Sequence, residues 1–405
     1  MKRYWKSILL CSLSIIVVGT FYIQSSFADQ TNIQIKFDRV KGDENEVKDL
    51  ILYGDYSVGN LYQSLKITSE ETIDQNQQSF LQRMTTGRFA PVFKDLMKEH
   101  KGFLRGKELS PANYYENENL LVYAGLKGDS NEYPMRNIKF DIQIFNKKSG
   151  KKMVFQSDIP EKEKYSFMNV EDVQVINGEL KVMVRGFGIH GGEDLRYYTF
   201  NIDEQKLVKD ETIVSTQTTE KRWTDIRIIH DYNSIQPQNH YLILTETYEA
   251  QRVQENGEMT SYDGEPKLVE NEAFVYRIDK NQLKKLEIPD ELPQSGESYS
   301  IVDSTIFIHN RSANGIEVNQ YDMEKEEWEN PLTFELPLSA NKKDQPYIKF
   351  MNGKMYLIRS TSNGHTLFIG DVKTGESLYE GNLNVKNQRD VQKEYQLYFH
   401  EVNSL

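Results

Sequence analysis

The feature that most constrains the fold is a strand–turn–strand unit that recurs along the 405 residues. In each copy, a strand that contains an aromatic or large apolar residue is followed by a polar turn, and the next strand begins with an apolar residue. Turn dipeptides such as Asn177-Gly178 and Asn352-Gly353 also precede alternating apolar residues, which is typical of half-buried strands in hairpins. The chain is therefore predicted to be all-β. The copies lie at 61–67, 145–150, 200–205, 276–281, 321–326 and 369–375.

The spacing of these copies indicates how the hairpins are organised. Segments 74–108 and 249–272 lack the strand pattern, and once they are set aside, successive copies lie 45 to 55 residues apart. A four-stranded propeller blade takes about 40 to 50 residues. With hairpins such as 371–376 at the ends of blades, the sequence resembles β-propeller repeat proteins over most of residues 45–383. The resemblance implies a fold and no function.

Six blades are predicted, with seven as the alternative and a pair of two-sheet β-sandwiches as the competing fold. Apolar residues alternate at both ends of the domain, at 33–37 and at 395–399. We expect these two segments to complete a shared blade, because an open ring would leave strand edges exposed.

The first 28 residues have the layout of an export signal. Three basic residues within the first six precede an apolar stretch at 8–23, and the small residues Ser26 and Ala28 suit cleavage after Ala28. The alternative is an uncleaved membrane anchor with residues 29–405 outside the cytoplasm. The only cysteine, Cys11, lies in this segment. Residues 1–28 are thus predicted to be a signal peptide or anchor, and residues 29–405 a single exported β-propeller-like domain that touches the membrane only through 8–23 if uncleaved.

Segment 74–108 is predicted to be a helical insertion with one apolar face. The apolar residues with helical spacing are Phe89, Val92, Phe93, Leu96 and Met97. The other positions are mostly basic, and the candidate binding residues among them are Arg83, Arg88, Lys94, Lys98 and Lys101. These cations are interpreted as the solvated side of a helix packed on the propeller, as a docking patch for an anionic envelope component, or as part of a lid over a central channel.

Segment 249–272 is strongly acidic, with seven Asp and Glu residues against Arg252 and Lys267. It is predicted to be a solvated acidic loop. The alternatives are pairing with the basic insertion and weak calcium binding, although no Asp-x-Asp-x-Asp-Gly loop occurs in the sequence.

Most familiar enzyme signatures are absent from the sequence. The seven histidines show no zinc-site spacing, and no Gly-x-Ser-x-Gly elbow or phosphate-binding loop occurs. No metal and no cofactor is predicted. The loop at 185–194 holds four glycines, and His190, Glu193 and Asp194 there are candidates for a ligand site or an acid–base pair. The competing interpretation is a strand connection whose glycines adopt positive φ angles.

The charge balance argues against nucleic acid as a partner, since the net charge is −12. The leading hypothesis is a non-catalytic, extracytoplasmic propeller that binds an envelope protein or an anionic envelope polymer or lipid. The alternative is a secreted carbohydrate-active hydrolase or lyase that uses carboxylates in the channel.

Overall fold

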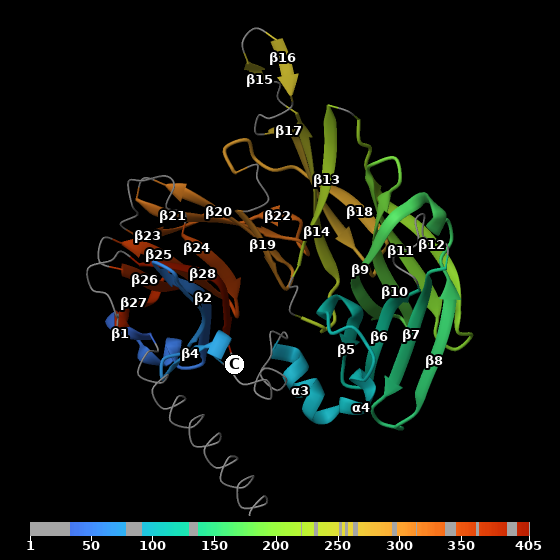
Figure 1. Cartoon of the computed structure of the whole chain (residues 1–405), viewed down its shortest axis with the longest axis horizontal. Coiled ribbons are helices and arrows are strands. Elements are labelled where there is room, and N and C mark those ends of the chain that lie inside the picture. The colour runs from blue at the N-terminus through green and yellow to red at the C-terminus, as the bar shows by residue number, and fades with distance from the viewer. Residues whose placement is uncertain are drawn as a thin grey trace, which may run out of the picture. The chain divides into compact units, whose positions relative to one another are not determined.

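The computed structural model shows an all-β protein, as the sequence predicts (Figure 1). The predicted signal or anchor at 1–28 lies outside the residues that the structure describes. Within those residues, no helix is long and apolar enough to cross a membrane. The described residues are 33–77, 91–128, 137–219, 221–230, 234–250, 253–255, 258–261, 266–293, 298–312, 314–336, 346–361, 364–386 and 395–404.

The chain divides into two compact units. Unit 2 comprises Thr85–Ser312 and Ile316–Leu332, and its described residues form four large antiparallel sheets and one two-stranded hairpin. Three of the large sheets have four strands, and the fourth is a five-stranded sheet whose main path has four; the strands of each path follow chain order. The strands are β5 (Tyr114–Glu116), β6 (Leu120–Lys127), β7 (Lys139–Asn146) and β8 (Lys152–Asp158); β9 (Tyr165–Ile176), β10 (Glu179–Gly188), β11 (Glu193–Asn201) and β12 (Lys206–Ser215); β13 (Arg222–Ile229), β14 (His240–Glu249), β17 (Lys267–Arg277) and β18 (Gln282–Leu286); and β19 (Tyr299–Val302), β20 (Thr305–Ser312), β21 (Gly315–Asp322) and β22 (Glu327–Trp328).

Successive sheets of unit 2 pack on one another through separate apolar layers. Phe140 and Tyr198 belong to the layer between the β5–β8 and β9–β12 sheets, where their ring centroids lie 5.0 Å apart. Leu195 and Ile228 belong to the layer between the β9–β12 sheet and the sheet of β13, β14, β17 and β18. A third layer joins that sheet to β19–β22. The two inner sheets are therefore covered on both faces by apolar side chains.

The predicted acidic loop at 249–272 is partly strand. The short hairpin of β15 (Val253–Glu255) and β16 (Glu258–Ser261) lies within it, and β17 begins at Lys267. The register of β17 continues along β14, with Lys267 opposite Glu249. Pairing with a long neighbouring strand extends β17 through a run whose polar composition hides its strand character.

The recurring unit of the sequence marks one position in the sheets. Five of its six copies lie where the third strand of a sheet turns into the fourth, whereas the copy at 61–67 is strand throughout. The side chains of Asn146, Asn201, Asp322 and Asp371 accept hydrogen bonds from backbone N–H groups two or three residues further on. Short polar side chains favour such turns because they replace a backbone acceptor.

A second hydrogen bond recurs at the same turns. The backbone N–H of the residue after the third strand donates to a carbonyl in the turn between the first and second strands of the same sheet. The four pairs are Lys147 to Asn119, Ile278 to Asn239, Met323 to Ser304 and Val372 to Gly353, at 2.8 to 3.1 Å.

Unit 1 is built from both ends of the chain. It comprises Met1–Met84, Ala313–Gly315 and Thr333–Leu405. Its sheets have the orders β1-β27-β26-β25-β24 and β28-β2-β3-β4, and they pack through one apolar layer. The elements are β1 (Gln34–Gly42), η1 (Glu44–Val47), β2 (Leu50–Val58), β3 (Leu61–Ile67), β4 (Thr72–Asp74), η2 (Gln75–Gln77), β23 (Leu332–Glu335), β24 (Tyr347–Met351), β25 (Lys354–Thr361), β26 (Gly364–Asp371), β27 (Ser377–Lys386) and β28 (Gln396–Ser404).

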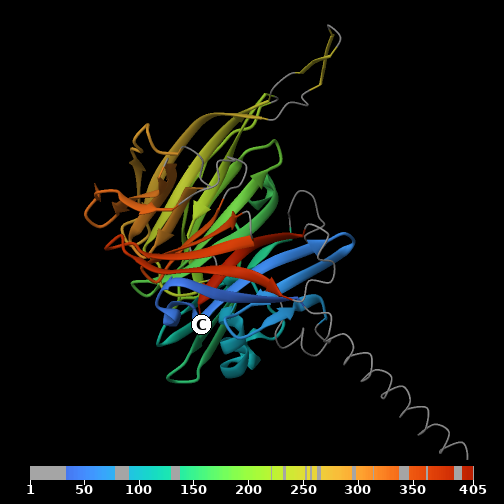
Figure 2. The ribbon, with the colours of Figure 1, turned by 90° about the vertical axis from the view of Figure 1, so that its left-hand side faces the viewer.

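The two terminal strands exchange sheets instead of sharing one blade. β1 forms the edge of the sheet made by the last strands, and β28 forms the edge of the sheet made by the first. Figures 1 and 2 accordingly show blue and red strands interleaved in this unit. Gly42 ends β1 with φ +88°, and a Cβ there would lie 2.0 Å from the carbonyl oxygen of Leu378. Only glycine allows this close approach.

A buried carboxyl lies between two sheets of unit 2. Asp172 of β9 is 5% exposed and accepts a hydrogen bond from the Tyr241 hydroxyl of β14 at 2.5 Å. Burial raises the pKa of Asp172 to about 6, although hydrogen bonds from Tyr241 and Gln174 oppose the shift. Since each pKa unit corresponds to about 1.4 kcal/mol, ionisation of this group costs on the order of 3 kcal/mol of stability.

We expect the free energy of unfolding to fall as the pH rises from about 4 to about 6. In that interval the folded protein keeps the proton on Asp172 while the unfolded chain has lost it, so the slope is negative. Asp172→Asn keeps an acceptor for Tyr241 and removes the titration. Urea unfolding of both proteins across this range measures the difference, and parallel pH profiles would contradict the prediction.

Candidate functional site

The described part of the helical insertion packs its apolar side on the first sheet of unit 2. Helix α3 (Pro91–Glu99) begins at a proline, whose fixed φ suits a first helical turn. Phe93 and Leu96 stand three residues apart, share a face and are buried. The ring of Phe93 meets that of Tyr114 in β5 edge to face, with centroids 5.1 Å apart. This packing directs the polar positions of α3 away from the core.

The short helix α4 (Lys101–Leu104) brings the insertion against the β7–β8 hairpin. The Phe145 ring at the end of β7 lies 5.5 Å from the His100 ring and 6.3 Å from the Phe103 ring. Lys152 is the register partner of Phe145, and its Nζ lies 5.7 Å from the centroid of Phe103. Two segments about 45 residues apart in the sequence are thereby joined at Phe103.

Cations from both segments form what we call the basic surface. It consists of Lys101, Arg105, Lys107, Lys148, Lys151 and Lys152. In the described ranges, none of the six has a carboxylate oxygen within 4.0 Å, whereas most basic residues elsewhere in unit 2 form ion pairs. Lys107 is half-buried and the other five are exposed. The result is a cluster of uncompensated positive charge on a chain of net charge −12.

Lys107 is held most firmly within the basic surface. Its Nζ donates to the carbonyl oxygen of Phe103 and lies 4.3 Å and 5.6 Å from the ring centroids of Phe103 and Tyr123. Burial and repulsion from Lys152 lower the pKa of Lys107 to about 8. An anion bound here would relieve this repulsion and favour the charged amine.

The candidate residues of the insertion are only partly described. Arg83 and Arg88 lie outside the described residues, as does the side chain of Lys94. Lys98 is exposed and pairs with Asp95 at 3.2 Å, where both side chains are 76% exposed. Lys101 is exposed and belongs to the basic surface. Exposed pairs such as Lys98–Asp95 contribute little energy, about 1 kcal/mol or less.

The glycine-rich loop forms a tight connection between β10 and β11. Gly191 and Gly192 have φ values of +85° and +83°, and the Gly188 amide donates to the Gly192 carbonyl. His190 is exposed on this turn. Positive φ angles at consecutive positions explain the glycines.

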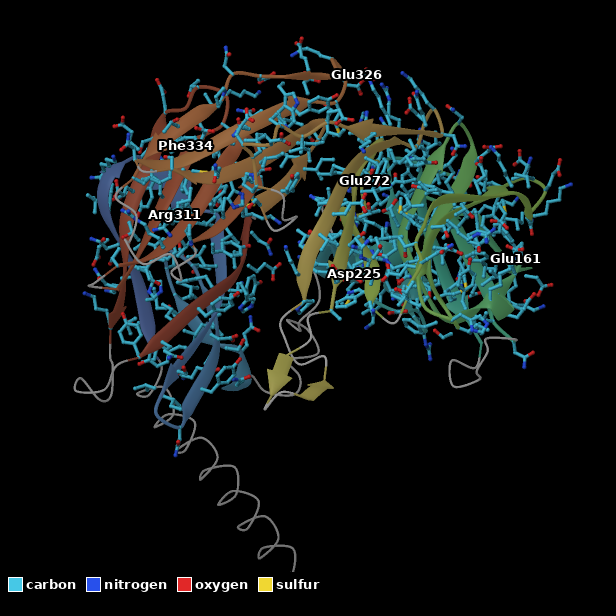
Figure 3. All side chains as sticks on the ribbon, turned by 90° about the horizontal axis from the view of Figure 1, so that it is seen from above. Glu161, Asp225, Glu272, Arg311, Glu326 and Phe334 are labelled. Atoms are coloured by element: carbon cyan, nitrogen blue, oxygen red, sulfur yellow. The ribbon has the colours of Figure 1, made fainter. Side chains whose placement is uncertain are left out.

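Glu193 joins two sheets at the edge of strand β13. Its carboxylate lies 3.4 Å from Arg185 Nη1 and accepts from the backbone N–H of Ile226 at 3.4 Å, while Arg185 donates to the Ile226 carbonyl at 2.6 Å. Arg185 Nε also lies 2.9 Å from Glu171. Burial raises the pKa of Glu193, and the nearby carboxyl of Asp225, labelled in Figure 3, adds to the shift, while Arg185 opposes it. Ile226 lies on the edge strand β13, where its N–H and C=O have no partner strand on that side among the described residues. Glu193 and Arg185 of the β9–β12 sheet supply the hydrogen bonds that these two backbone groups need.

Asp194 has different partners from those of Glu193. Its carboxylate accepts from the hydroxyls of Tyr165 at 2.7 Å and Ser215 at 2.5 Å. Adjacent residues in a strand point to opposite faces, so the structure does not bring Glu193 and Asp194 to one point. Arg196 extends the network by donating to Tyr165 at 3.2 Å and pairing with Glu161, labelled in Figure 3, at 3.0 Å.

Two features of this geometry were missed from the sequence. The turn 146–152 carries four lysines and no acidic residue, so it is a local run of positive charge as well as a hairpin. The proximity of this turn to α4 could not be predicted from the sequence, because it depends on the packing of Phe103 on Phe145. The role of Arg185 could not be predicted either, because its two carboxylate partners, Glu171 and Glu193, lie on different strands.

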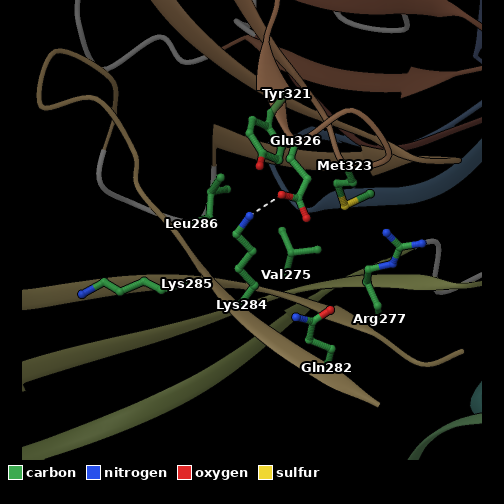
Figure 4. A pocket seen from close by; sticks show the side chains of 9 residues that line it. All are labelled: Val275, Arg277, Gln282, Lys284, Lys285, Leu286, Tyr321, Met323 and Glu326. Carbon is green, nitrogen blue, oxygen red and sulfur yellow. Dashed lines mark hydrogen bonds and ion pairs between the residues drawn. The ribbon is translucent and has the colours of Figure 1, made fainter. Parts of the chain in front are cut away.

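Among the described residues, no group of three His, Cys, Asp or Glu side chains is placed to hold a metal ion. The hollow in Figure 4 lies between the β17–β18 hairpin and the turn after β21, where Lys284 donates to Glu326. Its volume of about 10 Å³ is close to the minimum for one water molecule, so it has no room for a substrate.

The chain matches no protein-family model and no curated protein sequence. Similar solved structures include the polysaccharide lyase Uly1, which is 10% identical with a TM-score of 0.34 over 64% of this chain and 57% of the lyase. A PL25 ulvan lyase is 8% identical with a TM-score of 0.34 over 67% and 69% of the two chains. TolB from Acinetobacter baumannii is 11% identical with a TM-score of 0.22 over 87% and 82%. This chain thus spans little more than half of Uly1, and these similarities establish neither a family nor a function.

Proposed function

We propose that this protein is an exported, non-catalytic binding protein that docks on an anionic polymer of the cell envelope through the basic surface. The observation that carries the proposal is the joining of α4 and the β7–β8 turn at Phe103, which gathers six cations without carboxylate partners among the described residues. A cluster of this sign attracts polyanions over about one Debye length, roughly 8 Å at physiological salt.

We propose a six-bladed propeller as the scaffold that presents this surface. Six sheets of four or five strands in the described residues support this arrangement. Further support comes from the successive packing of the four sheets of unit 2 and from the hydrogen bond repeated between turns of four sheets.

A non-catalytic role is supported by the carboxylates of the glycine-rich region. Glu171 and Glu193 share the guanidinium of Arg185, which also donates to the Ile226 carbonyl. One arginine thus engages both carboxylates, whereas a glycosidase needs two carboxyl groups that face the scissile bond. For this reason we favour binding over the carbohydrate-active hydrolase or lyase.

A polymer is favoured over a lipid bilayer because of what surrounds the cations. The exposed residues within 101–107 and 146–152 are Lys, Arg, Gly and Ser, with no exposed apolar side chain that would enter a membrane. Stable binding of a protein surface to a bilayer generally needs apolar insertion in addition to charge.

Charge neutralisation tests the docking proposal. We expect the full-length protein, purified in mild detergent, to bind a poly(glycerol phosphate) oligomer at 50 mM NaCl. The quadruple variant Lys101→Gln, Arg105→Gln, Lys148→Gln, Lys151→Gln should bind at least about tenfold more weakly, since each cation near a polyanion contributes on the order of 1 kcal/mol. Calorimetric titration gives both dissociation constants.

The control removes four exposed lysines elsewhere in unit 2 and changes the net charge equally: Lys206→Gln, Lys209→Gln, Lys284→Gln, Lys285→Gln. It should bind like the wild type. Equal affinities for all three proteins, or no binding by the wild type, would refute the proposal. Binding to phosphatidylglycerol vesicles but not to the polymer would assign the surface to a bilayer and refute it as well.

A further inference from the structure

A cavity of about 580 Å³ lies in unit 2 between β9 and the segment that leads into the β5–β8 sheet. On one side it is lined by Phe167, Asn169 and Glu171 of β9, and on the other by Glu108 and Asn113. Its volume falls in the range of small-molecule sites, about 300 to 1,000 Å³.

The two walls differ in character. Residues 167–171 of β9 all line the cavity, and the register of β9 with β10 shifts at Glu171, so this wall is the edge of the strand. Phe167 is 46% exposed, which leaves much of its ring free for contact with a ligand. On the opposite wall, the buried amide of Asn113 donates from Nδ2 to the carbonyl of Ala124 at 2.9 Å, which fixes its orientation.

The charge of the cavity is negative. Among the described residues that line it, Glu108 and Glu171 carry charge and none is basic. Behind Glu171, the single guanidinium of Arg185 is shared with Glu193, so carboxylates outnumber the cation between them. Burial raises the pKa values of both glutamates, although Arg185 opposes the shift in each case.

We propose that this cavity binds the ammonium group of a small organic amine, against the ring of Phe167 and within reach of the carboxylates of Glu108 and Glu171. An aromatic face attracts a cation by about 0.5 to 2 kcal/mol, more as the site excludes water. Asn169 supplies a further polar group at the wall. The site uses no residue of the basic surface, so it is a second binding function beyond polymer docking.

A matched pair of probes isolates the charge. 1,5-Diaminopentane and 1,5-pentanediol have the same chain length, but only the first carries ammonium groups at pH 7. We expect saturation-transfer NMR and calorimetry on the full-length protein to show binding of the diamine, with the diol at least tenfold weaker. Equal binding of the two probes, or no binding of the diamine, would overturn the proposal whatever the result with poly(glycerol phosphate).

Two variants locate the amine. Phe167→Leu keeps an apolar side chain and removes the aromatic face, and we expect diamine affinity to fall about three- to thirtyfold. Glu108→Gln should weaken binding similarly at an exposed position. The controls Glu118→Gln and Val208→Ala change exposed residues outside the cavity and should bind like the wild type. Thermal unfolding checks that all variants are folded, and wild-type affinity in both cavity variants would refute the assignment.

Discussion

The Arg185→Met variant is expected to lose about 3 to 5 kcal/mol of its free energy of unfolding at pH 7. Arg185 is 17% exposed and compensates the carboxylates of Glu171 and Glu193, which are 16% and 14% exposed. Methionine fills a similar volume but leaves both carboxylates without a counter-charge, and it leaves the carbonyl of Ile226 without its donor. Urea unfolding followed by circular dichroism measures the loss.

The pH dependence of this variant distinguishes lost charge from lost packing. Burial raises the pKa values of Glu171 and Glu193, and removal of Arg185 raises them further. Protonation then neutralises the orphaned acids, so the deficit should shrink as the pH is lowered from 7 to 5. Arg222→Met is the control, since its pair with Glu249 at 3.7 Å is 58% and 44% exposed and contributes about 1 kcal/mol or less. A deficit independent of pH, or equal in the two variants, would contradict this interpretation.

The Phe399→Ala variant is expected to destabilise unit 1 by about 3 to 5 kcal/mol, the usual effect of removing a buried aromatic ring. Phe399 lies on β28, is 4% exposed and belongs to the apolar layer between the two sheets of the unit. Its neighbour Tyr398 points the opposite way and is 68% exposed. Tyr398→Ala on the same strand should therefore change stability by about 0.5 kcal/mol or less.

Hydrogen exchange read by mass spectrometry suits this comparison, because a chain with two units need not unfold in one step. In Phe399→Ala, exchange should accelerate in β2 and β28, while β10 of unit 2 keeps its wild-type protection. Unchanged exchange in β28 would show that this edge strand does not depend on the Phe399 contact.

Local signals predicted the hairpins well because their causes are local. The side chains of Asp371 and Asn146 each accept hydrogen bonds from backbone N–H groups two or three residues further along the chain. Such a turn depends on only a few adjacent residues. The alternation of apolar and polar residues likewise predicts a strand at 395–399, where β28 begins at Gln396. This pattern carries no information on the partner strand, which for β28 is β2, with paired residues 339 to 354 positions apart.

The candidate site was harder to predict because its geometry depends on distant contacts. Glu193 and Asp194 are adjacent in sequence, yet the strand sends one to Arg185 and Ile226 and the other to Tyr165 and Ser215. The lysines of 147–152 were visible as charges, but only the packing of Phe103 on Phe145 places them beside α4. The charge and type of each residue can be read from the sequence, whereas the fold determines which side chains come together.

The exchange of terminal strands in unit 1 has a consequence for the order of folding. Ile35 faces Val385 across β1 and β27, a closure over 350 residues. By the polymer estimate such a loop costs about 5 kcal/mol of chain entropy, and contacts of this separation form slowly. Most of unit 2 is one continuous stretch, Thr85–Ser312, and can form while the rest of the chain is still being made. Unit 1 gains strand β28 only when Gln396–Ser404 has been synthesised, so the sheet that β2 begins is closed after the continuous stretch of unit 2 has been made.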